Sequence, residues 1–289
     1  MPETEKFNWK LSIRANVLVL RLVGLWPQED EVYGPNLYTV YAIFSTVIVM
    51  GSHNVFQVIS IFYAYDNLET LTQTIVITIT DLLASVKMYL FMKKIKLLKE
   101  LMITLNSDLF QPRNPEQVEL VLPSLTFWKT TYSVFFAMAS TSVLSWLVLP
   151  FVDQSFKQHK LPFVAWYPYD TQISPWYEIT YFYQAVCVLY FGVTIVNMDM
   201  MIAALMMFVG TQCEILCHDL KTLQNCPYVE KGNKYSFSQK FVSCVKHHRQ
   251  LIRFAQDSNI FFNMIVLGQF VTSTVAIAVS CSKLLWLIL

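Results

Sequence analysis

The stretch TTYSVFFAMASTSVLSWLVLPFV, residues 130–152, decides the class of fold. It has 23 residues, and none of them is Asp, Glu, Lys, Arg or His. An α-helix rises about 1.5 Å per residue, so about 20 apolar residues cross the roughly 30 Å hydrocarbon core of a bilayer. The stretch therefore predicts a transmembrane helix.

Four further stretches have a similar length and composition. Only isolated ionisable residues interrupt them, such as His53 in the first and Asp81 and Lys87 in the second. None alternates apolar and polar residues with the period of two that a membrane β-barrel requires. We therefore expect an all-α, polytopic membrane protein with five transmembrane helices, at residues 37–63, 71–92, 130–152, 179–210 and 260–289.

The overall composition agrees with this class. Of the 289 residues, 55% are hydrophobic and 14% are charged, and the mean hydropathy is +0.43. Soluble domains carry about 25% charged residues, so a disordered chain is excluded and a membrane protein or an enzyme with a large buried core remains. The five long apolar stretches favour the membrane protein. A net charge of +1 provides no overall field that would attract nucleic acid.

Basic residues are distributed unequally between the connecting segments. Residues 1–36, 93–124 and 211–259 hold sixteen Lys and Arg, whereas the remaining two connections hold two. Because basic loops stay in the cytoplasm, the N-terminus should be cytoplasmic, opposite to G-protein-coupled receptors. The predicted cytoplasmic segments are 1–36, 93–129 and 211–259, and the predicted extracellular segments are 64–70 and 153–178.

Two connecting segments have a distinct character. Residues 7–26 have apolar side chains at helical spacing, which predicts an amphipathic helix that ends at Gly24. This helix lies either on the inner membrane surface or against the protein's own cytoplasmic side. The aromatic, proline-containing loop 153–178 either forms an interfacial belt or folds over the bundle as a lid.

The chain carries no signature of catalysis, and we predict no enzyme, no catalytic residue and no cofactor. It lacks GxSxG, HExxH and a glycine-rich phosphate loop. The cytoplasmic cysteines and histidines match no closed zinc module, so no metal site is expected. All six cysteines fall in spans or on the reducing side, so no disulfide is expected.

Five Asp, His or Lys residues lie inside the predicted spans; besides Asp199 and Lys283 they are three residues that need interpretation. His53 is either a hydrogen-bonded core residue or a contact for ligand or water. Asp81 either bonds to a neighbouring helix or faces a hydrated cavity or ligand. Lys87 lies nearer the cytoplasmic end of its span, and we expect its ammonium to extend toward the membrane surface.

The predicted outer halves of three spans present apolar, aromatic and hydroxyl side chains at similar depth. This composition suits a small, volatile, weakly polar ligand, although each stripe is also compatible with plain helix packing. The candidate pocket residues are Ile75, Thr78 and Ile79 in the second span, Met138, Ser142 and Trp146 in the third, and Tyr183, Cys187 and Tyr190 in the fourth.

An ordered set of sequence strings resembles the insect odorant receptors along the whole chain. The strings are RLVGLWP (21–27), ITITD (77–81), LPFVAWYPYD (161–170), SPWYEITYFYQ (174–184), QCEILCHDL (212–220) and HHRQLIRF (247–254). The resemblance implies a seven-transmembrane receptor with a cytoplasmic N-terminus that is a subunit of a ligand-gated cation channel. Five spans of the expected seven are present, so we expect a C-terminally truncated chain that lacks the pore-lining span.

The resemblance also implies a function in olfaction. An odorant small molecule would bind in an outer-leaflet pocket, and an odorant co-receptor subunit would complete a hetero-tetramer in the lipid bilayer. Subunit contacts would concentrate in residues 211–259, and the location would be the plasma membrane of olfactory sensory neurons. The alternatives are a gustatory-type receptor of the same topology and a transporter-like membrane protein, although no inverted repeat supports the latter.

Overall fold

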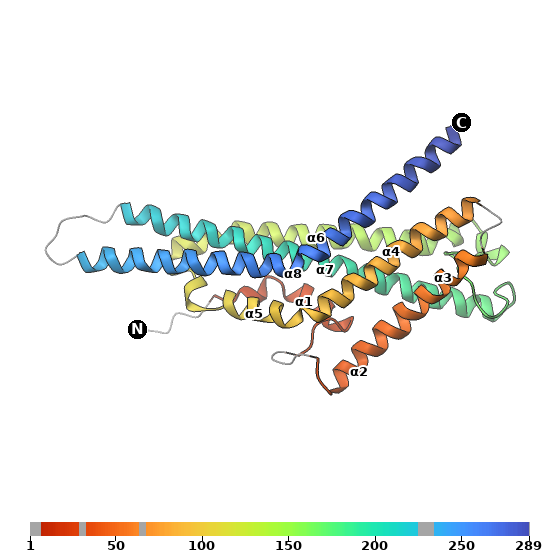
Figure 1. The fold of residues 1–289 in the computed structure, drawn as a ribbon, viewed down its shortest axis with the longest axis horizontal. Helices are drawn as coiled ribbons and strands as arrows, with labels where there is room; N and C mark the ends of the chain where they lie inside the picture. Colours follow the sequence, from red (N-terminus) through yellow and green to blue (C-terminus); the bar gives the residue numbers. More distant parts are fainter. Residues whose placement is uncertain (1–6, 29–32, 64–67, 225–233, 289) are drawn as a thin grey trace. The chain divides into compact units, whose positions relative to one another are not determined.

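The computed structural model describes residues 7–28, 33–63, 68–224 and 234–288. Residues 1–6, 29–32, 64–67, 225–233 and 289 lie outside these ranges, and Cys226 is among them. They belong to the predicted segments 1–36, 64–70, 211–259 and 260–289. Every regular element within the described ranges is helical, which confirms the predicted all-α class (Figure 1).

Eight α-helices and several short helical turns make up the described chain. The α-helices are α1 (Arg14–Leu22), α2 (Leu37–Phe44), α3 (Ser52–Tyr63), α4 (Leu68–Lys93), α5 (Ile95–Leu105), α6 (Pro115–Val152), α7 (Trp176–Gln224) and α8 (Lys234–Ile288). A π-helical segment, Ser45–Gly51, joins α2 to α3. Short 3-10 turns occur at Trp9–Leu11, Asp108–Phe110 and Ser155–Gln158.

Within the described residues, five helical segments are long and apolar enough to cross a membrane, as the sequence predicts. They are Leu37–Tyr63, Thr74–Lys93, Pro115–Val152, Trp176–Leu223 and Phe237–Val275. Three of the helices extend well beyond the predicted spans. The extensions of α7 to Gln224 and of α8 back to Lys234 follow the helical spacing in the sequence, whereas the start of α6 at Pro115 was not expected.

The described chain divides into two compact units. Unit 1 comprises Met1–Val17, Lys94–Val134 and Asp199–Asn263, and unit 2 comprises Leu18–Lys93, Phe135–Met198 and Met264–Leu289. Each of the helices α6, α7 and α8 contributes one part to each unit. Unit 2 holds all nine candidate pocket residues.

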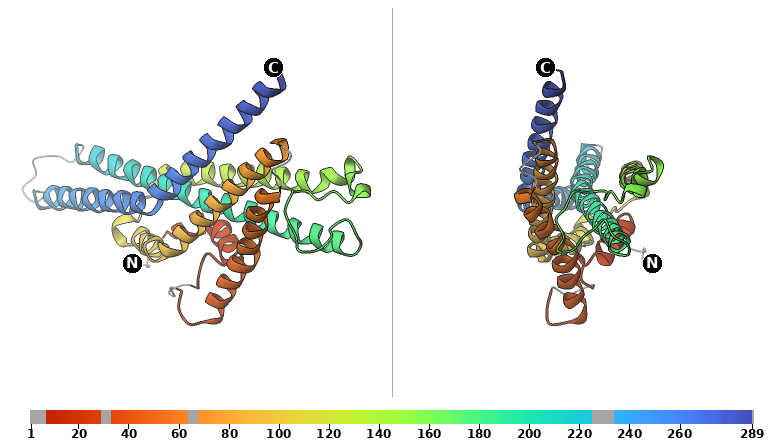
Figure 2. Two further views of the ribbon diagram at one scale, coloured as in Figure 1. Left: turned by 45° about the vertical axis from the view of Figure 1, so that its right-hand side comes forward. Right: turned by 90° about the vertical axis from the view of Figure 1, so that its right-hand side faces the viewer.

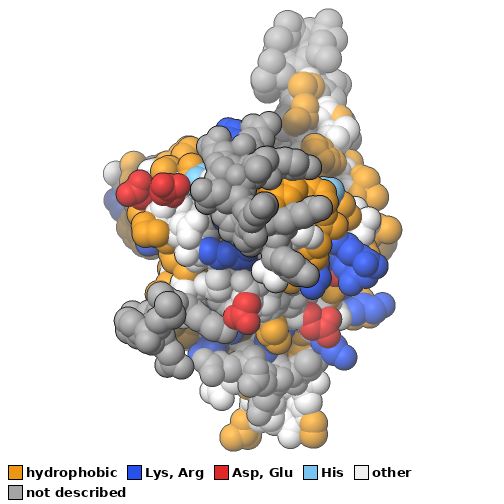
Figure 3. Space-filling view, turned by 90° about the vertical axis from the view of Figure 1, so that its left-hand side faces the viewer, with side chains coloured by type: hydrophobic (Ala, Val, Ile, Leu, Met, Phe, Trp, Pro, Cys, Tyr) orange, Lys and Arg blue, Asp and Glu red, His pale blue; other side chains and the backbone are white. Residues whose placement is uncertain are grey.

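The core of unit 1 combines aromatic packing with buried amide contacts. Phe110 packs against Phe254 and His247, with ring centroids 5.5 and 5.4 Å apart. Gln212 donates to the Phe110 carbonyl at 3.0 Å, and its Oε1 lies 3.0 Å from His247 Nε2. These contacts tie α7, α8 and the 3-10 turn together. Figure 3 shows basic and acidic side chains interspersed with apolar ones on the left-hand face of Figure 1.

The end of α1 in unit 2 is fixed by backbone geometry. Gly24 has φ +85°, and its N–H donates to the Arg21 carbonyl while Leu25 N–H donates to the Leu20 carbonyl. This pair of bonds is the Schellman arrangement, in which glycine tolerates the left-handed conformation. Helix α1 therefore ends where the sequence predicts, but it begins at Arg14, later than the predicted amphipathic helix.

Four tyrosine hydroxyls cap the same helix end. Tyr38 donates to the Arg21 carbonyl at 3.0 Å, Tyr190 to the Val23 carbonyl at 2.7 Å and Tyr33 to the Gly24 carbonyl at 2.8 Å. Tyr41 donates to the Leu22 carbonyl. The last carbonyls of a helix have no partner within the helix, so these hydroxyls satisfy four consecutive acceptors.

Helices α3 and α4 pack against each other within unit 2 (Figure 1, Figure 2). Helix α2, the π-helical segment and α3 follow one another without a break and are called the α2–α3 rod. Asn36 caps the start of this rod, because its side chain accepts the Thr39 N–H at 2.8 Å. The side chain of Lys87 in α4 is buried, and its Nζ lies 3.3 Å from Gln269 Oε1 of α8.

Candidate ligand-binding site

The nine candidate pocket residues occupy different environments in unit 2. Thr78 and Cys187 are buried, whereas Met138 and Trp146 are 67% and 53% exposed. Ile75, Ile79, Tyr183 and Tyr190 are half-buried, and Ser142 is exposed. The nine side chains therefore share unit 2 but differ in exposure, because they face different directions around their helices.

The candidate residues of α7 contact the α2–α3 rod. Tyr183 shares a hydrogen bond with Ser52 of α3, and Cys187 Sγ lies 3.6 Å from the Val49 carbonyl. The ring of Tyr183 also meets Phe56 edge-on, with centroids 6.2 Å apart. Helix α3 is thus a wall of this region that the sequence stripes did not include.

The Tyr190 hydroxyl hydrogen-bonds to the C-terminal end of α1. It donates to the Val23 carbonyl at 2.7 Å and lies 3.4 Å from Ser45 Oγ. The phenol oxygen is therefore engaged with a backbone carbonyl and with the Ser45 side chain.

Gln184 holds the aromatic loop onto the helices of unit 2. Its Oε1 accepts the Phe163 N–H at 3.1 Å, and its Nε2 donates to the Phe163 carbonyl at 3.0 Å and to the Tyr167 hydroxyl at 3.1 Å. Gln184 is fully buried. An amide that satisfies both backbone groups of one residue fixes that residue in place. Gln184 therefore fixes the backbone of the aromatic loop at Phe163 onto α7.

Aromatic contacts extend this attachment. Tyr167 packs against Phe56 of α3, with ring centroids 5.0 Å apart, and Trp166 stacks on Tyr63 at 5.7 Å. Burial raises the pKa of the Tyr167 phenol, so this hydroxyl stays neutral. Trp146 of α6 stacks on Phe163 with centroids 5.4 Å apart and planes 14° apart. The loop is therefore the element that connects Trp146 to Gln184.

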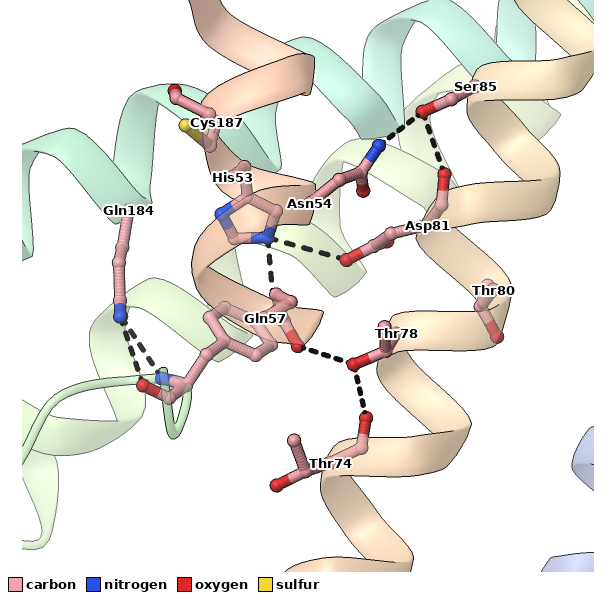
Figure 4. Close-up of polar contacts among 12 residues, drawn as sticks. His53, Asn54, Gln57, Thr74, Thr78, Thr80, Asp81, Ser85, Gln184 and Cys187 are labelled. Carbon is pink, nitrogen blue, oxygen red and sulfur yellow. Dashed lines mark hydrogen bonds and ion pairs between the residues drawn. The ribbon is translucent and has the colours of Figure 1, made fainter. Parts of the chain in front are cut away.

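A polar network between α3 and α4 lies beside these residues (Figure 4). His53 Nε2 lies 3.3 Å from Asp81 Oδ2 and 3.3 Å from Gln57 Nε2. Thr78 Oγ1 lies 3.2 Å from Gln57 Oε1. Asp81 of α4 thus contacts the neighbouring helix α3.

Asn54 and Ser85 extend the same network. Asn54 Nδ2 donates to Ser85 Oγ at 2.7 Å, and Ser85 Oγ donates to the Asp81 carbonyl at 2.9 Å. The sequence carried a signal for this interface. Polar side chains recur at 53, 57 and 60 and at 74, 78, 81 and 85, a spacing of three and four residues that marks one face of each helix.

Helices α6 and α7 approach closely at Gly192. A Cβ at Gly192 would lie 2.9 Å from Val143 Cγ2, so only glycine permits this approach. A cavity of about 120 Å³ adjoins the contact, and Phe136, Val143, Leu189 and Gly192 are among the residues that line it. None of the nine candidate residues lines it, because the stripe at 138, 142 and 146 falls on a different face of α6.

Comparisons with known proteins place the chain in a family. The family model "7tm Odorant receptor" matches residues 67–287. The curated Odorant receptor Or1 of Anopheles gambiae is 21% identical over 306 residues, covering 96% of this chain and 71% of that protein.

Solved structures show the same fold. The insect olfactory receptor OR5 from Machilis hrabei aligns with a TM-score of 0.78 at 19% identity, covering 93% of this chain and 70% of that chain. The structure of the same receptor in complex with eugenol also aligns with a TM-score of 0.78, at 20% identity. Because the family model matches most of the chain, this multi-pass membrane protein belongs to the insect odorant receptor family.

Proposed function

We propose that this odorant receptor binds a small, weakly polar volatile molecule in the outer half of unit 2. The observation that carries the proposal is the family match over residues 67–287. The receptor of Machilis hrabei named above is described in complex with eugenol, a phenol of the size and polarity expected here. Membership of a receptor family also favours a receptor over an enzyme.

The proposed pocket combines the candidate stripes with the walls formed by α3 and the aromatic loop. Trp146, Phe163 and Tyr183 supply ring faces, and Ile75 and Ile79 supply aliphatic surface. Aromatic surface with a few hydroxyls is the usual lining of a site for small apolar ligands. Thr78 is engaged with Gln57, so we assign it to positioning the α3–α4 wall.

A binding experiment tests this pocket directly. Eugenol is titrated into the purified chain in lipid nanodiscs, and quenching of tryptophan fluorescence reports the affinity. Trp146→Ala should weaken binding at least tenfold, because it removes the ring that stacks on Phe163.

Trp176→Ala is the matched control. Trp176 is similarly exposed, at 47%, and also makes one aromatic contact with the loop, to Tyr169 at 5.0 Å. Its substitution should leave the eugenol affinity within about twofold. Equal losses in the two variants would assign Trp146 to packing and contradict the proposed pocket.

Signalling is proposed to require assembly with a co-receptor in the plasma membrane of olfactory sensory neurons, through residues 211–259. The assembly would respond to the bound odorant by opening a cation channel. Cells that express a full-length receptor containing this sequence, together with an insect co-receptor, should show an odorant-evoked cation current whose tuning differs from that of the co-receptor alone. Identical currents with and without that receptor would contradict gating, while the titration above would still decide on binding.

A further inference from the structure

The cavity beside the Gly192 contact lies within unit 2 and apart from the nine candidate pocket residues. Its volume is about 120 Å³. One face of α6 and one face of α7 form its walls, because the lining positions of each helix recur at intervals of three and four residues. The walls include Phe136, Ala139 and Val143 of α6 and Leu189, Val193 and Val196 of α7.

The walls of this cavity are almost entirely hydrocarbon. Among the described residues that line it, none is charged and Ser140 has the one polar side chain. A buried water molecule needs roughly two to four polar partners, which a single serine hydroxyl does not supply. A guest with a polar group would lose its hydrogen bonds to water, whereas an apolar guest loses none. The chemistry of the walls therefore favours a hydrocarbon.

The size of the cavity limits the guest. An apolar cavity of about 150 Å³ in another protein stays dry and binds benzene or xenon. The present volume is about 120 Å³, so a hydrocarbon of benzene size or smaller matches it. The contact of α6 with α7 leaves no room for expansion at Gly192, since even a Cβ there would lie 2.9 Å from Val143 Cγ2. Eugenol carries three substituents on its ring and is therefore too large.

The rim of the cavity is open to molecules dissolved in the bilayer. Leu144 of α6 and Leu189 of α7 line the cavity and are also exposed on the surface of unit 2. Volatile hydrocarbons dissolve in the lipid phase, so they reach this rim without crossing water. A lipid acyl chain has many more carbon atoms than benzene, so the same volume does not enclose it.

We propose that this cavity is a second ligand site, which binds a hydrocarbon of benzene size or smaller. The hydrocarbon contacts the apolar side chains of α6 and α7 and makes no hydrogen bond. The site goes beyond the odorant pocket proposed above, because none of the nine candidate residues lines it. Recognition depends on volume and on the lack of polar groups, so a hydroxyl group on the guest weakens binding.

Two alanines of α6 provide a matched pair of substitutions. Ala139 is half-buried and lines the cavity, so Ala139→Leu fills the space of the guest. Ala137 is exposed and is not among the lining residues, so Ala137→Leu makes the same change on another face of α6. Val143→Ala acts in the opposite direction, because it removes two methyl groups from the wall and enlarges the cavity.

The experiment follows fluorobenzene, a probe close to benzene in size, by fluorine NMR on the purified chain in lipid nanodiscs. Empty nanodiscs give the signal of fluorobenzene dissolved in lipid. A saturable bound signal should appear with the wild type and with Ala137→Leu, and it should be lost in Ala139→Leu. Absence of this signal in the wild type, or its persistence in Ala139→Leu, would overturn the proposal.

The enlarged cavity of Val143→Ala gives a second measurement that does not depend on filling the site. Val143→Ala should bind the larger probe 4-fluorotoluene at least threefold more tightly than the wild type does, because the additional methyl group occupies the space that the valine loses. An unchanged affinity for 4-fluorotoluene would count against a site in this cavity.

Competition identifies the chemical class of the guest. At equal concentration in the lipid, benzene should displace fluorobenzene at least tenfold more effectively than phenol, because bound phenol would bury a hydroxyl group in an apolar wall. Equal displacement by the two compounds would contradict the recognition of a hydrocarbon.

Eugenol affinity, measured in the same preparations, separates this site from the odorant pocket. It should be unchanged in Ala139→Leu, which also shows that the variant is folded. Loss of both ligands in Ala139→Leu would contradict two separate sites, and Val143→Ala would then decide whether the cavity binds hydrocarbons. Saturable fluorobenzene binding without eugenol binding in the wild type would refute the proposed odorant pocket and leave this site standing.

Discussion

For several residues in unit 2, the amino-acid type alone indicates only part of the structural role. Gly24 must be glycine because it combines a positive φ with close contact to α2. Tyr190 was predicted as a pocket residue because of its aromatic ring, yet its hydroxyl is one of the four tyrosine hydroxyls that cap α1. His53 and Asp81 look like isolated polar residues along the chain, yet they form one pair in space. The role of each residue follows from its partner.

Gly24→Ala should destabilise the protein by about 2 kcal/mol. The new Cβ would lie 3.0 Å from the Ala42 Cα, and the backbone would remain in the left-handed region at φ +85°. Gly210→Ala is the control, because a Cβ there meets nothing within 4 Å and alanine favours a helix by roughly 0.5–1 kcal/mol. Thermal unfolding in detergent should show a lower midpoint for Gly24→Ala alone, and equal midpoints would contradict the assigned strain.

The His53–Asp81 pair should show energetic coupling in a double-mutant cycle. His53→Ala leaves the Asp81 carboxyl without its histidine partner, so Asp81→Asn should cost less in that background than in the wild type. We expect a coupling of about 1 kcal/mol. In the control cycle, His53→Ala and Thr80→Val should be additive, because Thr80 points away from α3 in Figure 4. Additive effects for His53 and Asp81 would rule out the pairing.

At the scale of elements, two kinds of interaction bring helices of unit 2 close together. Helices α3 and α4 meet through side-chain hydrogen bonds, whereas α6 and α7 meet through the absence of a side chain at Gly192. Both devices are expected in a bilayer, where apolar surface gains little from leaving lipid and association depends on packing and hydrogen bonds. A third kind of interaction attaches the aromatic loop to α7, because the Gln184 side chain hydrogen-bonds to the backbone of Phe163.

Gly192→Ala should weaken the α6–α7 contact, because its Cβ would lie 2.9 Å from Val143 Cγ2. The expected loss is about 1 kcal/mol in the free energy of unfolding, from overpacking. Val143→Ala removes the opposing methyl groups and should restore much of this loss in the double variant. Unfolding midpoints in detergent provide the measurement, and a double variant less stable than Gly192→Ala would argue against this geometry.

At the scale of the whole molecule, the charge distribution predicts how the chain is inserted. An epitope tag at the N-terminus should be inaccessible to antibody on intact cells and become accessible after permeabilisation. A tag inserted after Lys157, which is exposed in the aromatic loop, should be accessible without permeabilisation. The reverse labelling pattern would overturn the predicted orientation and, with it, the outward-facing odorant pocket.

The sequence alone determined the class of fold, the number of candidate spans, the end of α1 at Gly24 and the family. These features depend on sums over neighbouring residues, since the free energy of transfer into a bilayer adds along a segment and a glycine turn is local. The polar stripe from Thr74 to Ser85 was also visible as a pattern, although its partner on α3 was not.

The tertiary structure alone decided which faces meet. A helix in a bilayer is apolar on most sides, so the spacing of Met138, Ser142 and Trp146 does not tell which side faces protein and which faces lipid. The burial of Lys87 beside Gln269, the stacking of Trp146 on Phe163 and the four tyrosines on α1 join residues far apart in the chain. Such contacts depend on helix rotation and depth, which packing fixes and no local pattern encodes.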